Sequence, residues 1–214
     1  IIGEDPDVHV QAYFVYDSKK SGSQTVSHLR FGPEPIRSTY LVRQAQFVGC
    51  HQFAFIEKID VLAVAAHGAT LLLNSPYGPR EVWDHLPRPV QDQILAKAIK
   101  VWVIDADQVA RDAGLGSRTN SVLQTCFFAV SGVLPRGQAI EKIKKALAKT
   151  YRSKGAEVVK KNFDAVDRTL AALDEVTVPR QASGSRRMLP IVAAGAPPVV
   201  TAVVAAMHEG RGDE

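Results

Sequence analysis

Two adjacent lysines in a serine- and glycine-rich turn have the clearest capacity of any residues in this chain to bind an anion. Lys19 and Lys20 are followed directly by Ser21, Gly22 and Ser23. Ammonium groups, a hydroxyl and glycine amides match the charge and the acceptor oxygens of a phosphate. Lysines are also common on solvated hairpin turns, and the residue types alone favour that simpler interpretation. The turn lacks the glycine spacing and the following helix of a Walker A loop.

Two further stretches are candidates for ligand binding. The loop Gly114–Asn120 runs into a predicted helix, whose amino end favours anions, and Arg118 adds a positive charge. An ordinary connection between two helices explains that loop equally well. The stretch Asn74–Tyr77 follows a predicted strand, at the end where open α/β sheets bind ligands. A plain turn would also account for it.

The histidines and acidic residues form no recognisable catalytic or metal-binding pattern. The histidines lack the spacing of a shared metal site. Asp105 and Asp107 follow a predicted strand and could bind a ribose hydroxyl, although such residues more commonly cap the next helix. His85, close to Trp83, is more typical of packing than of catalysis. The basic surface within Lys142–Lys161 is explained most simply as a solvated helix face.

Composition places the chain among ordinary globular proteins. It has 214 residues, 46% hydrophobic residues and a net charge of +4, which is too small to indicate nucleic-acid binding but suits an anionic small ligand. Its two cysteines are too few for a disulfide framework, a zinc site or an iron–sulfur cluster, so a cytoplasmic location is expected. No apolar run is long enough to cross a membrane. Because residue 1 is not Met and no signal peptide follows, the sequence is expected to be a piece of a longer polypeptide.

Apolar runs and turn residues predict the elements that would position the candidates. Strands at Val8–Tyr16 and Thr25–Gly32 would form a hairpin around the lysine turn, and a third strand is predicted within Ile36–Gln52. Gly68–Pro76 and Val101–Asp105 read as short buried strands on either side of a helical segment. Strand, helix and strand in this order indicate a βαβ unit.

Helical periodicity dominates the second half of the chain, at Thr119–Val133 and Gln138–Leu173. The sequence therefore predicts an α/β fold with a mixed, largely parallel sheet flanked by helices and a long carboxyl-terminal helical segment. Serine, glycine, proline and arginine then become frequent, which is typical of a linker. The predicted organisation is one domain over residues 1–179, a linker over residues 180–198 and the start of a following segment over residues 199–214.

Four stretches, in this order, resemble one protein family. They are AYFVYDSKKSGSQTVSHLRFG, LLLNSPYG, VIDADQVARDAGLGSRTNSVLQTCFFAVSGVLP and KTYRSKGAEVVKKNFDAVD. Together they look like the third domain of the single-chain pyruvate:ferredoxin (flavodoxin) oxidoreductases, which is equivalent to the γ subunit of multi-subunit 2-oxoacid oxidoreductases. The resemblance covers about residues 1–180 and extends into the predicted linker. Members of the family also have a glycine-rich segment upstream of the position of Ile1, so the amino end of the domain is expected to be truncated.

The resemblance implies a reaction that needs more than this chain. The whole enzyme would convert pyruvate and coenzyme A (CoA) into acetyl-CoA and CO₂ and would reduce ferredoxin or flavodoxin. Thiamine diphosphate and iron–sulfur clusters would lie in other domains or subunits, and the fragment alone would be inactive. The parent is expected to be a homodimer without nucleic-acid or membrane partners. This domain would bind CoA and contact its sister domains.

The same resemblance assigns roles to individual residues. Lys19 and Lys20 would hold CoA phosphates, and no residue is assigned to catalysis or to a metal. This chain has Gly22-Ser23 where the family usually has two glycines, and Arg118 stands in a loop where a Lys-Arg pair is common; either change would weaken the phosphate contacts. Two alternatives stay open, namely a structural domain without ligand and an independent nucleotide-binding α/β enzyme. The candidate CoA-binding residues are Lys19, Lys20, Ser21, Arg30 and Asn120.

Overall fold

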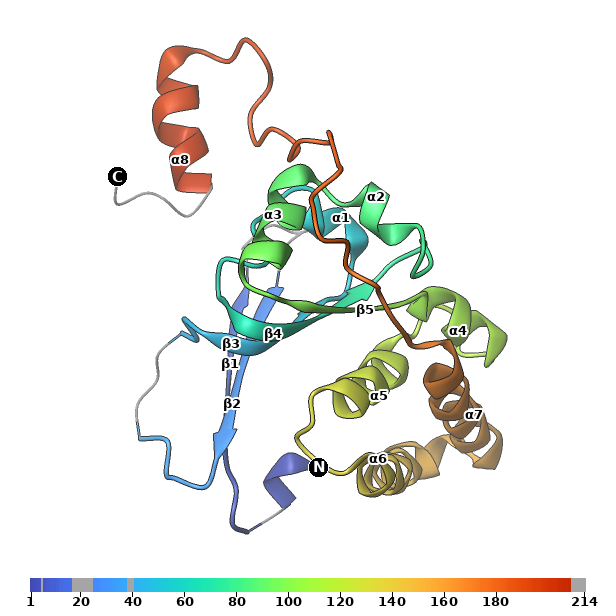
Figure 1. Ribbon diagram of the computed structural model, residues 1–214. Coiled ribbons are helices and arrows are strands. Elements are labelled where there is room, and N and C mark those ends of the chain that lie inside the picture. Colours follow the sequence, from blue (N-terminus) through green and yellow to red (C-terminus); the bar gives the residue numbers. More distant parts are fainter. Residues whose placement is uncertain (5, 17–24, 38–40, 209–214) are drawn as a thin grey trace.

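Two separate sheets organise the protein, one a two-stranded hairpin and the other a four-stranded sheet covered by helices (Figure 1). The structure is a computed structural model, and it describes residues 1–4, 6–16, 25–37 and 41–208. The predicted α/β fold with a mixed, largely parallel sheet flanked by helices is confirmed.

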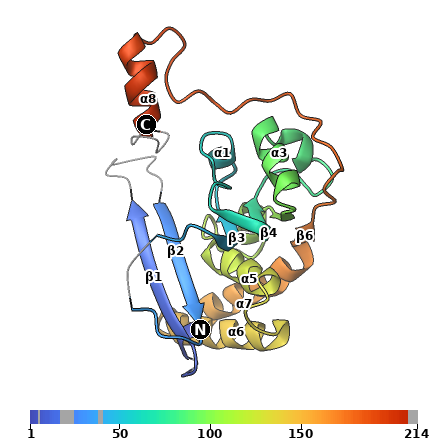
Figure 2. The same cartoon turned by 60° about the vertical axis from the view of Figure 1, so that its left-hand side comes forward.

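The hairpin consists of β1 (His9–Tyr16) and β2 (Thr25–Gly32), and it follows a short 3-10 helix, η1 (Ile2–Glu4). The strands pair antiparallel along their whole length, from His9 opposite Gly32 to Tyr16 opposite Thr25. Aromatic and β-branched residues favour this extended backbone. The sequence predicts the hairpin but not its separation from the main sheet, which Figure 2 shows clearly.

The main sheet has the order β3-β4-β5-β6, with β3 (Ala45–Cys50), β4 (Ala65–Asn74) and β5 (Lys100–Ile104) parallel. The two-residue strand β6 (Asp174–Glu175) closes the edge antiparallel to β5. Consecutive leucines at 71, 72 and 73 are all buried. Such a continuous apolar run is expected in a strand that has helices against both of its faces.

One face of the main sheet is covered by three short helices, α1 (Phe53–Ile56), α2 (Val82–His85) and α3 (Arg88–Ala96). Their apolar side chains share a core with alternate residues of β4 and β5, including Leu71 and Val101. The helical stretch between these strands is interrupted after α2, and α3 begins directly after Pro87. Pro87 is the N-cap of α3, and Pro89 lies in its first turn, where proline is favoured because its fixed φ suits the helix and its missing N–H would have no partner there.

The other face is covered by α4 (Ala106–Asp112), α5 (Asn120–Val130) and α7 (Ala156–Ala172). A further helix, α6 (Arg136–Tyr151), packs on α5 and α7 rather than on the sheet. The 3-10 turn η2 (Arg152–Lys154) joins α6 to α7. The predicted break at Gly155 is present, and its φ of 94° is one that glycine adopts readily.

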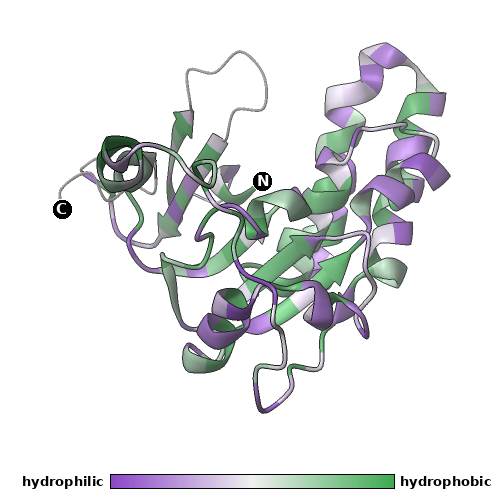
Figure 3. Ribbon diagram, turned by 90° about the horizontal axis from the view of Figure 1, so that it is seen from above, coloured by the Kyte–Doolittle hydropathy of each residue, from purple (hydrophilic) through white to green (hydrophobic). Residues whose placement is uncertain are grey.

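After β6 the chain turns back across the face that carries α2 and α3, and it ends in a helical piece that stands apart from the sheet (Figures 1 and 2). This piece contains η3 (Val200–Val204) and α8 (Ala205–His208). Seen from above, it is strongly hydrophobic (Figure 3). The division of the chain at residues 179 and 198 stays a prediction.

Candidate functional site

The lysine turn predicted from the sequence belongs to the segment that connects the two strands of the hairpin. Lys19, Lys20 and Ser21 lie outside the described residues. The last described pair of the hairpin is Tyr16 opposite Thr25, so each strand is paired up to its boundary with the turn segment 17–24.

Arg30 lies on β2, on the face of the hairpin that also carries Gln11 and His28. Its Nη2 atom donates a hydrogen bond to Oε1 of Gln11, the residue directly opposite on β1. On the same face, the backbone N–H of Val42 donates to Nδ1 of His28, over 3.1 Å. The side chains of Gln11, His28 and Arg30 belong to half-buried residues. The sequence places His28 in this strand but assigns it no role in a site.

Asn120 is the first residue of α5 and is exposed. The preceding loop contains Gly114, with φ of 70°, whose N–H donates to the carbonyl of Arg111 over 2.9 Å. The N–H of Leu115 donates to the carbonyl of Ala110 over 2.8 Å. These two bonds are those of a Schellman motif, so the helix end of α4 accounts for Gly114 without a ligand.

The structure does not bring Arg30 and Asn120 together. The loop between α4 and α5 is well separated from the hairpin in Figure 1. These two candidates therefore belong to different surfaces, and a ligand that contacts both must be long.

Asn74, at the carboxyl end of β4, ties together the ends of three strands. Its Nδ2 atom donates to the carbonyl of His51 and to Oδ2 of Asp107, over 3.0 Å in each case. Its Oδ1 atom accepts from the N–H of Ala106 over 2.9 Å. The carboxamide is thus used fully within the protein, and the simpler interpretation of this stretch as a structural turn explains its geometry.

The acidic residue at the end of β5 caps the next helix. Oδ1 of Asp105 accepts a hydrogen bond from the N–H of Gln108 over 2.8 Å, at the start of α4. Close by, the imidazole of His51 lies against Gly49. Desolvation lowers the pKa of His51 although the residue is exposed overall. The ring is therefore neutral at neutral pH and adds no positive charge for an anion.

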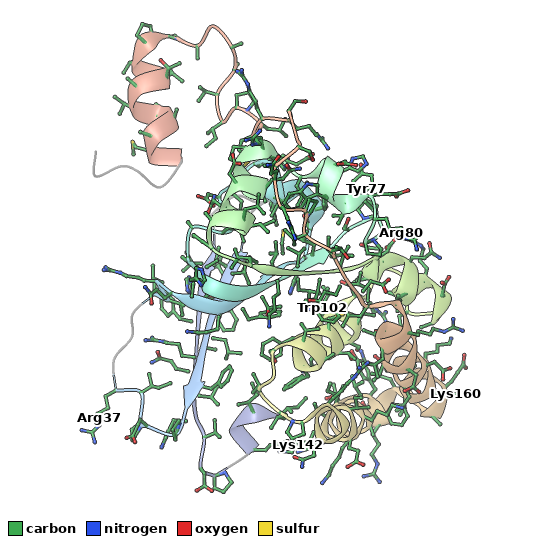
Figure 4. The ribbon with its side chains drawn as sticks, viewed as in Figure 1. Arg37, Tyr77, Arg80, Trp102, Lys142 and Lys160 are labelled. Carbon is green, nitrogen blue, oxygen red and sulfur yellow. The ribbon has the colours of Figure 1, made fainter. Side chains whose placement is uncertain are left out.

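Aromatic rings pack beside the Asn74 turn. Tyr77 stacks on His85 with ring centroids 3.5 Å apart, and Phe53 meets Tyr77 edge to face at 5.3 Å. This confirms the interpretation of His85 as a packing residue. A hollow of about 470 Å³ is lined by Trp83 and by Arg80, which Figure 4 labels beside Tyr77. Asp84 also lines it, so the hollow has mixed charge and does not favour a phosphate.

Residues of the predicted linker are hydrogen-bonded to the domain. The buried carboxamide of Gln91 accepts from the N–H groups of Ser183 and Gly184, over 3.0 and 2.9 Å. Its Nε2 atom donates to the carbonyl of Trp83 over 2.7 Å. Sequence reasoning missed Gln91, although a glutamine between apolar residues of an amphipathic helix is a recognisable signal of a buried polar contact.

The basic surface of α6 and α7 is solvated, as the sequence indicates. Lys142 and Lys160 point outward from their helices in Figure 4. Lys144 pairs with Asp167 at 2.7 Å, and Lys161 pairs with Glu157 at 2.8 Å. Acidic neighbours therefore balance part of the charge of this surface.

The two cysteines lie in different cores. Cys50 belongs to the core under α1–α3, and Cys126 belongs to the core on the opposite face of the sheet. Burial raises the pKa of Cys50 to about 11 and that of Cys126 to about 12. Within the described part of the chain, no three or more His, Cys, Asp and Glu side chains gather where they could hold a metal ion. Nor does any helix there combine the length and the apolar character that crossing a membrane requires.

Comparison with known proteins gives one consistent family. The family model described as pyruvate ferredoxin/flavodoxin oxidoreductase matches residues 4–172. A pyruvate-flavodoxin oxidoreductase of Rhodospirillum rubrum is 55% identical over 213 residues, which is 100% of this chain but 18% of that protein. The chain thus spans less than a fifth of the length of this relative.

Solved structures share the fold at low sequence identity. The pyruvate oxidoreductase subunit PORC of Thermotoga maritima aligns with a TM-score of 0.57 at 17% identity, over 78% of this chain and 82% of that one. A 2-oxoglutarate:ferredoxin oxidoreductase of Magnetococcus marinus, solved with 2-oxoglutarate, CoA and succinyl-CoA bound, aligns with a TM-score of 0.51 at 14% identity. That alignment covers 85% of this chain and 28% of the other. The fold therefore occurs both as a separate subunit and inside a larger chain.

Proposed function

The chain belongs to the pyruvate ferredoxin/flavodoxin oxidoreductase family, and from this premise we propose that it works as one part of a larger enzyme. That enzyme converts pyruvate and CoA into acetyl-CoA and CO₂ and passes the electrons to ferredoxin or flavodoxin. The observation that carries the proposal is the identity of 55% to a pyruvate-flavodoxin oxidoreductase over the whole chain. We propose a cytoplasmic homodimer for the intact enzyme.

The side chains present here do not suit the electron-transfer cofactors of such an enzyme. An iron–sulfur cluster is commonly held by four cysteines, whereas Cys50 and Cys126 are the only two and lie on opposite faces of the sheet. We therefore assign the clusters, together with thiamine diphosphate, to other parts of the enzyme. The contribution of this chain is binding and positioning.

We propose that this contribution is CoA binding, with the turn of the hairpin as its main contact. Lys19 and Lys20 supply charge that attracts a phosphate, and Ser21 supplies a hydroxyl donor. Arg30 lies on the hairpin that leads to this turn. Asn120 stands at the amino end of an 11-residue helix, where backbone N–H groups and the helix dipole favour an anion. The CoA-bound oxidoreductase that shares this fold supports the choice of ligand.

The alternative is a scaffold domain of the same enzyme that binds no ligand. Two observations favour it. Arg30 is hydrogen-bonded to Gln11, and the loop that precedes Asn120 is well separated from the hairpin in Figure 1. In this alternative the domain only holds neighbouring parts of the enzyme in place.

The two functions differ in their response to loss of the lysine pair. The test uses an intact oxidoreductase that carries this chain, for example the Rhodospirillum rubrum enzyme with its matching segment replaced. Changing both Lys19→Ala and Lys20→Ala is expected to raise the KM for CoA about tenfold or more, since each tenfold corresponds to about 1.4 kcal/mol of binding. CoA-independent decarboxylation of pyruvate should not change.

A control variant removes the same charge elsewhere. Lys142→Ala with Lys145→Ala lies on the solvated surface of α6 and is expected to leave the KM for CoA unchanged. If neither the double variant of Lys19 and Lys20 nor this control changes the KM for CoA, the domain acts as a scaffold and does not bind CoA.

A further inference from the structure

One face of the hairpin is apolar and largely exposed, although at its base Val10 lies against Gly3, and Phe31 lines a small hollow together with Val133 and Leu134. Residues directly opposite each other in an antiparallel pair share a face, and successive residues alternate between faces. The register therefore places one set of side chains on a single surface, which we name the apolar hairpin face. Its apolar members are Val10, Ala12, Phe14, Tyr16, Leu29 and Phe31.

The exposure of this face is large for apolar side chains. Phe14 is 53% exposed, Tyr16 is 71% exposed and Leu29 is 42% exposed. Fully burying one side chain of this size contributes about 1.5–3 kcal/mol. A partner that covers the face would therefore gain several such contributions.

The arginine and the histidines of the paired strands lie on the opposite face. His9, His28 and Arg30 all occupy that second face, together with Gln11. On that second face Gln11, His28 and Arg30 are half-buried, whereas the apolar residues nearer the turn, Tyr13, Val15 and Val26, are 37–46% exposed. A hairpin that packed on a core within its own chain would bury its apolar face and leave its polar face in water.

The structure offers this hairpin little support of its own. Among the described residues, β1 and β2 form strand pairs only with each other, and two-stranded sheets are marginally stable without a further layer. Contiguous exposed apolar surface on a protein is typical of an interaction site. The remaining question is which surface covers it.

We propose that the apolar hairpin face docks against an uncharged, apolar surface in another part of the oxidoreductase to which this chain contributes. The inference rests on the proposed function, in that the chain works inside a larger enzyme. Its whole length matches 18% of a relative, so most of the surfaces available to it belong to the remainder of such a polypeptide. An uncharged partner is required because no charged residue of the paired strands lies on this face to compensate a buried charge. A membrane surface is disfavoured because His9, His28 and Arg30 point to the other side.

Footprinting of apolar side chains tests this docking directly. A photoactivated carbene probe is applied to the isolated chain and to the intact oxidoreductase that carries it, both without CoA. Phe14, Tyr16 and Leu29 are expected to be labelled in the isolated chain and at least fivefold less in the intact enzyme. Leu41, which is 48% exposed and lies outside the face, is the matched control and is expected to be labelled in both. Equal labelling of Leu29 in the two samples would overturn the proposal.

Concentration separates the proposed partner from a second copy of the chain. Protection of Leu29 in the isolated chain that increases with protein concentration would show self-association instead, and would overturn the proposal. Because CoA is absent, failure of CoA binding cannot produce the expected protection or remove it.

Matched leucine variants give a second, independent result. Leu29→Asp places a charge on the apolar hairpin face, and Leu41→Asp places one on a similarly exposed site elsewhere. In the intact enzyme, Leu29→Asp is expected to make the hairpin at least tenfold more sensitive to limited proteolysis, while Leu41→Asp leaves cleavage unchanged. Equal cleavage of both variants would contradict the docking.

Discussion

The hairpin and the main sheet use the same kinds of residue in opposite ways. In the main sheet, Leu71, Leu72 and Leu73 are covered on both faces, and the polar side chain of Asn74 is fully hydrogen-bonded. In the hairpin, apolar side chains such as Phe14 are open to water. The main sheet thus contains its own core, whereas most apolar side chains of the hairpin stay exposed in the described part of the chain.

This difference indicates which part of the chain carries its own stability. Removal of apolar area from water is the main favourable contribution to folding, and the hairpin realises little of it within this chain. The hairpin gains its missing contribution only where another surface covers it. We therefore expect the main sheet to be stable in the isolated chain, and the hairpin to be stable only within the larger enzyme.

The largest expected effect comes from one matched substitution in each region. Leu73→Ala is expected to lower the free energy of unfolding by about 2–5 kcal/mol, because the side chain is completely buried and its removal leaves a cavity. Leu29→Ala is expected to change it by less than about 0.5 kcal/mol in the isolated chain. Urea unfolding followed by circular dichroism measures both. Similar losses for the two variants would mean that the hairpin belongs to the same cooperative unit as the sheet.

Loss of the Gln91 carboxamide should have the next largest effect. Gln91→Ala is expected to cost about 2–3 kcal/mol, because the N–H groups of Ser183 and Gly184 lose their acceptor. The released segment should also be cleaved faster near residue 184 by a protease. Gln93→Ala, on the same helix but bonded to exposed Asp60, is the control and should have little effect.

Alkaline pH should weaken the main sheet through its buried thiols. The folded-state pKa values of about 11 for Cys50 and about 12 for Cys126 lie above the ordinary value of 9.0. Each thiol stays protonated in the folded protein at pH values where it would ionise in the unfolded chain. Its contribution to stability is therefore complete below the pKa of the unfolded state, and it is lost as pH rises toward the pKa of the folded state.

The free energy of unfolding should therefore fall between pH 9 and pH 11, at up to about 1.4 kcal/mol per pH unit for each thiol. Urea midpoints at a series of pH values measure this decline. The variant Cys126→Ala, which keeps one of the two thiols, should show a shallower decline. An equally steep decline in that variant would mean that other groups cause it.

The smallest expected effect is at the surface of α6 and α7. Asp167→Asn removes the ion pair between Asp167 and Lys144. The side chain of Asp167 is 60% exposed. We expect a loss of at most about 0.5 kcal/mol, which salt would reduce further. Thermal unfolding at low and at high salt measures it. A loss larger than that of Gln91→Ala would reverse the expected order.

Local signals predicted much of this fold. The apolar run Leu71–Leu73 predicts a buried strand, and Gly155 predicts the break between two long helices. Aromatic and β-branched residues between positions 13 and 31 predict the hairpin. Each of these features depends on neighbours in the sequence, so the residue pattern contains the necessary information.

Long-range polar contacts could not be predicted in the same way. Gln91 binds residues about ninety positions later, and Asn74 binds Asp107 in the first turn of helix α4, so neither partner is visible in the local pattern. The apolar hairpin face was unpredictable for another reason. The alternation along β1 shows that two faces exist, but it does not show which of them the chain itself covers.

Hydrogen–deuterium exchange measured on the isolated chain and on the intact oxidoreductase tests the central claim most directly. The account predicts that amides of β4 and β5 exchange equally slowly in both, because their core is complete within this chain. It predicts that amides of β1 and β2 exchange fast in the isolated chain and at least tenfold more slowly in the intact enzyme. Equally slow exchange of the hairpin in both samples would contradict the account, since the hairpin would then need no partner.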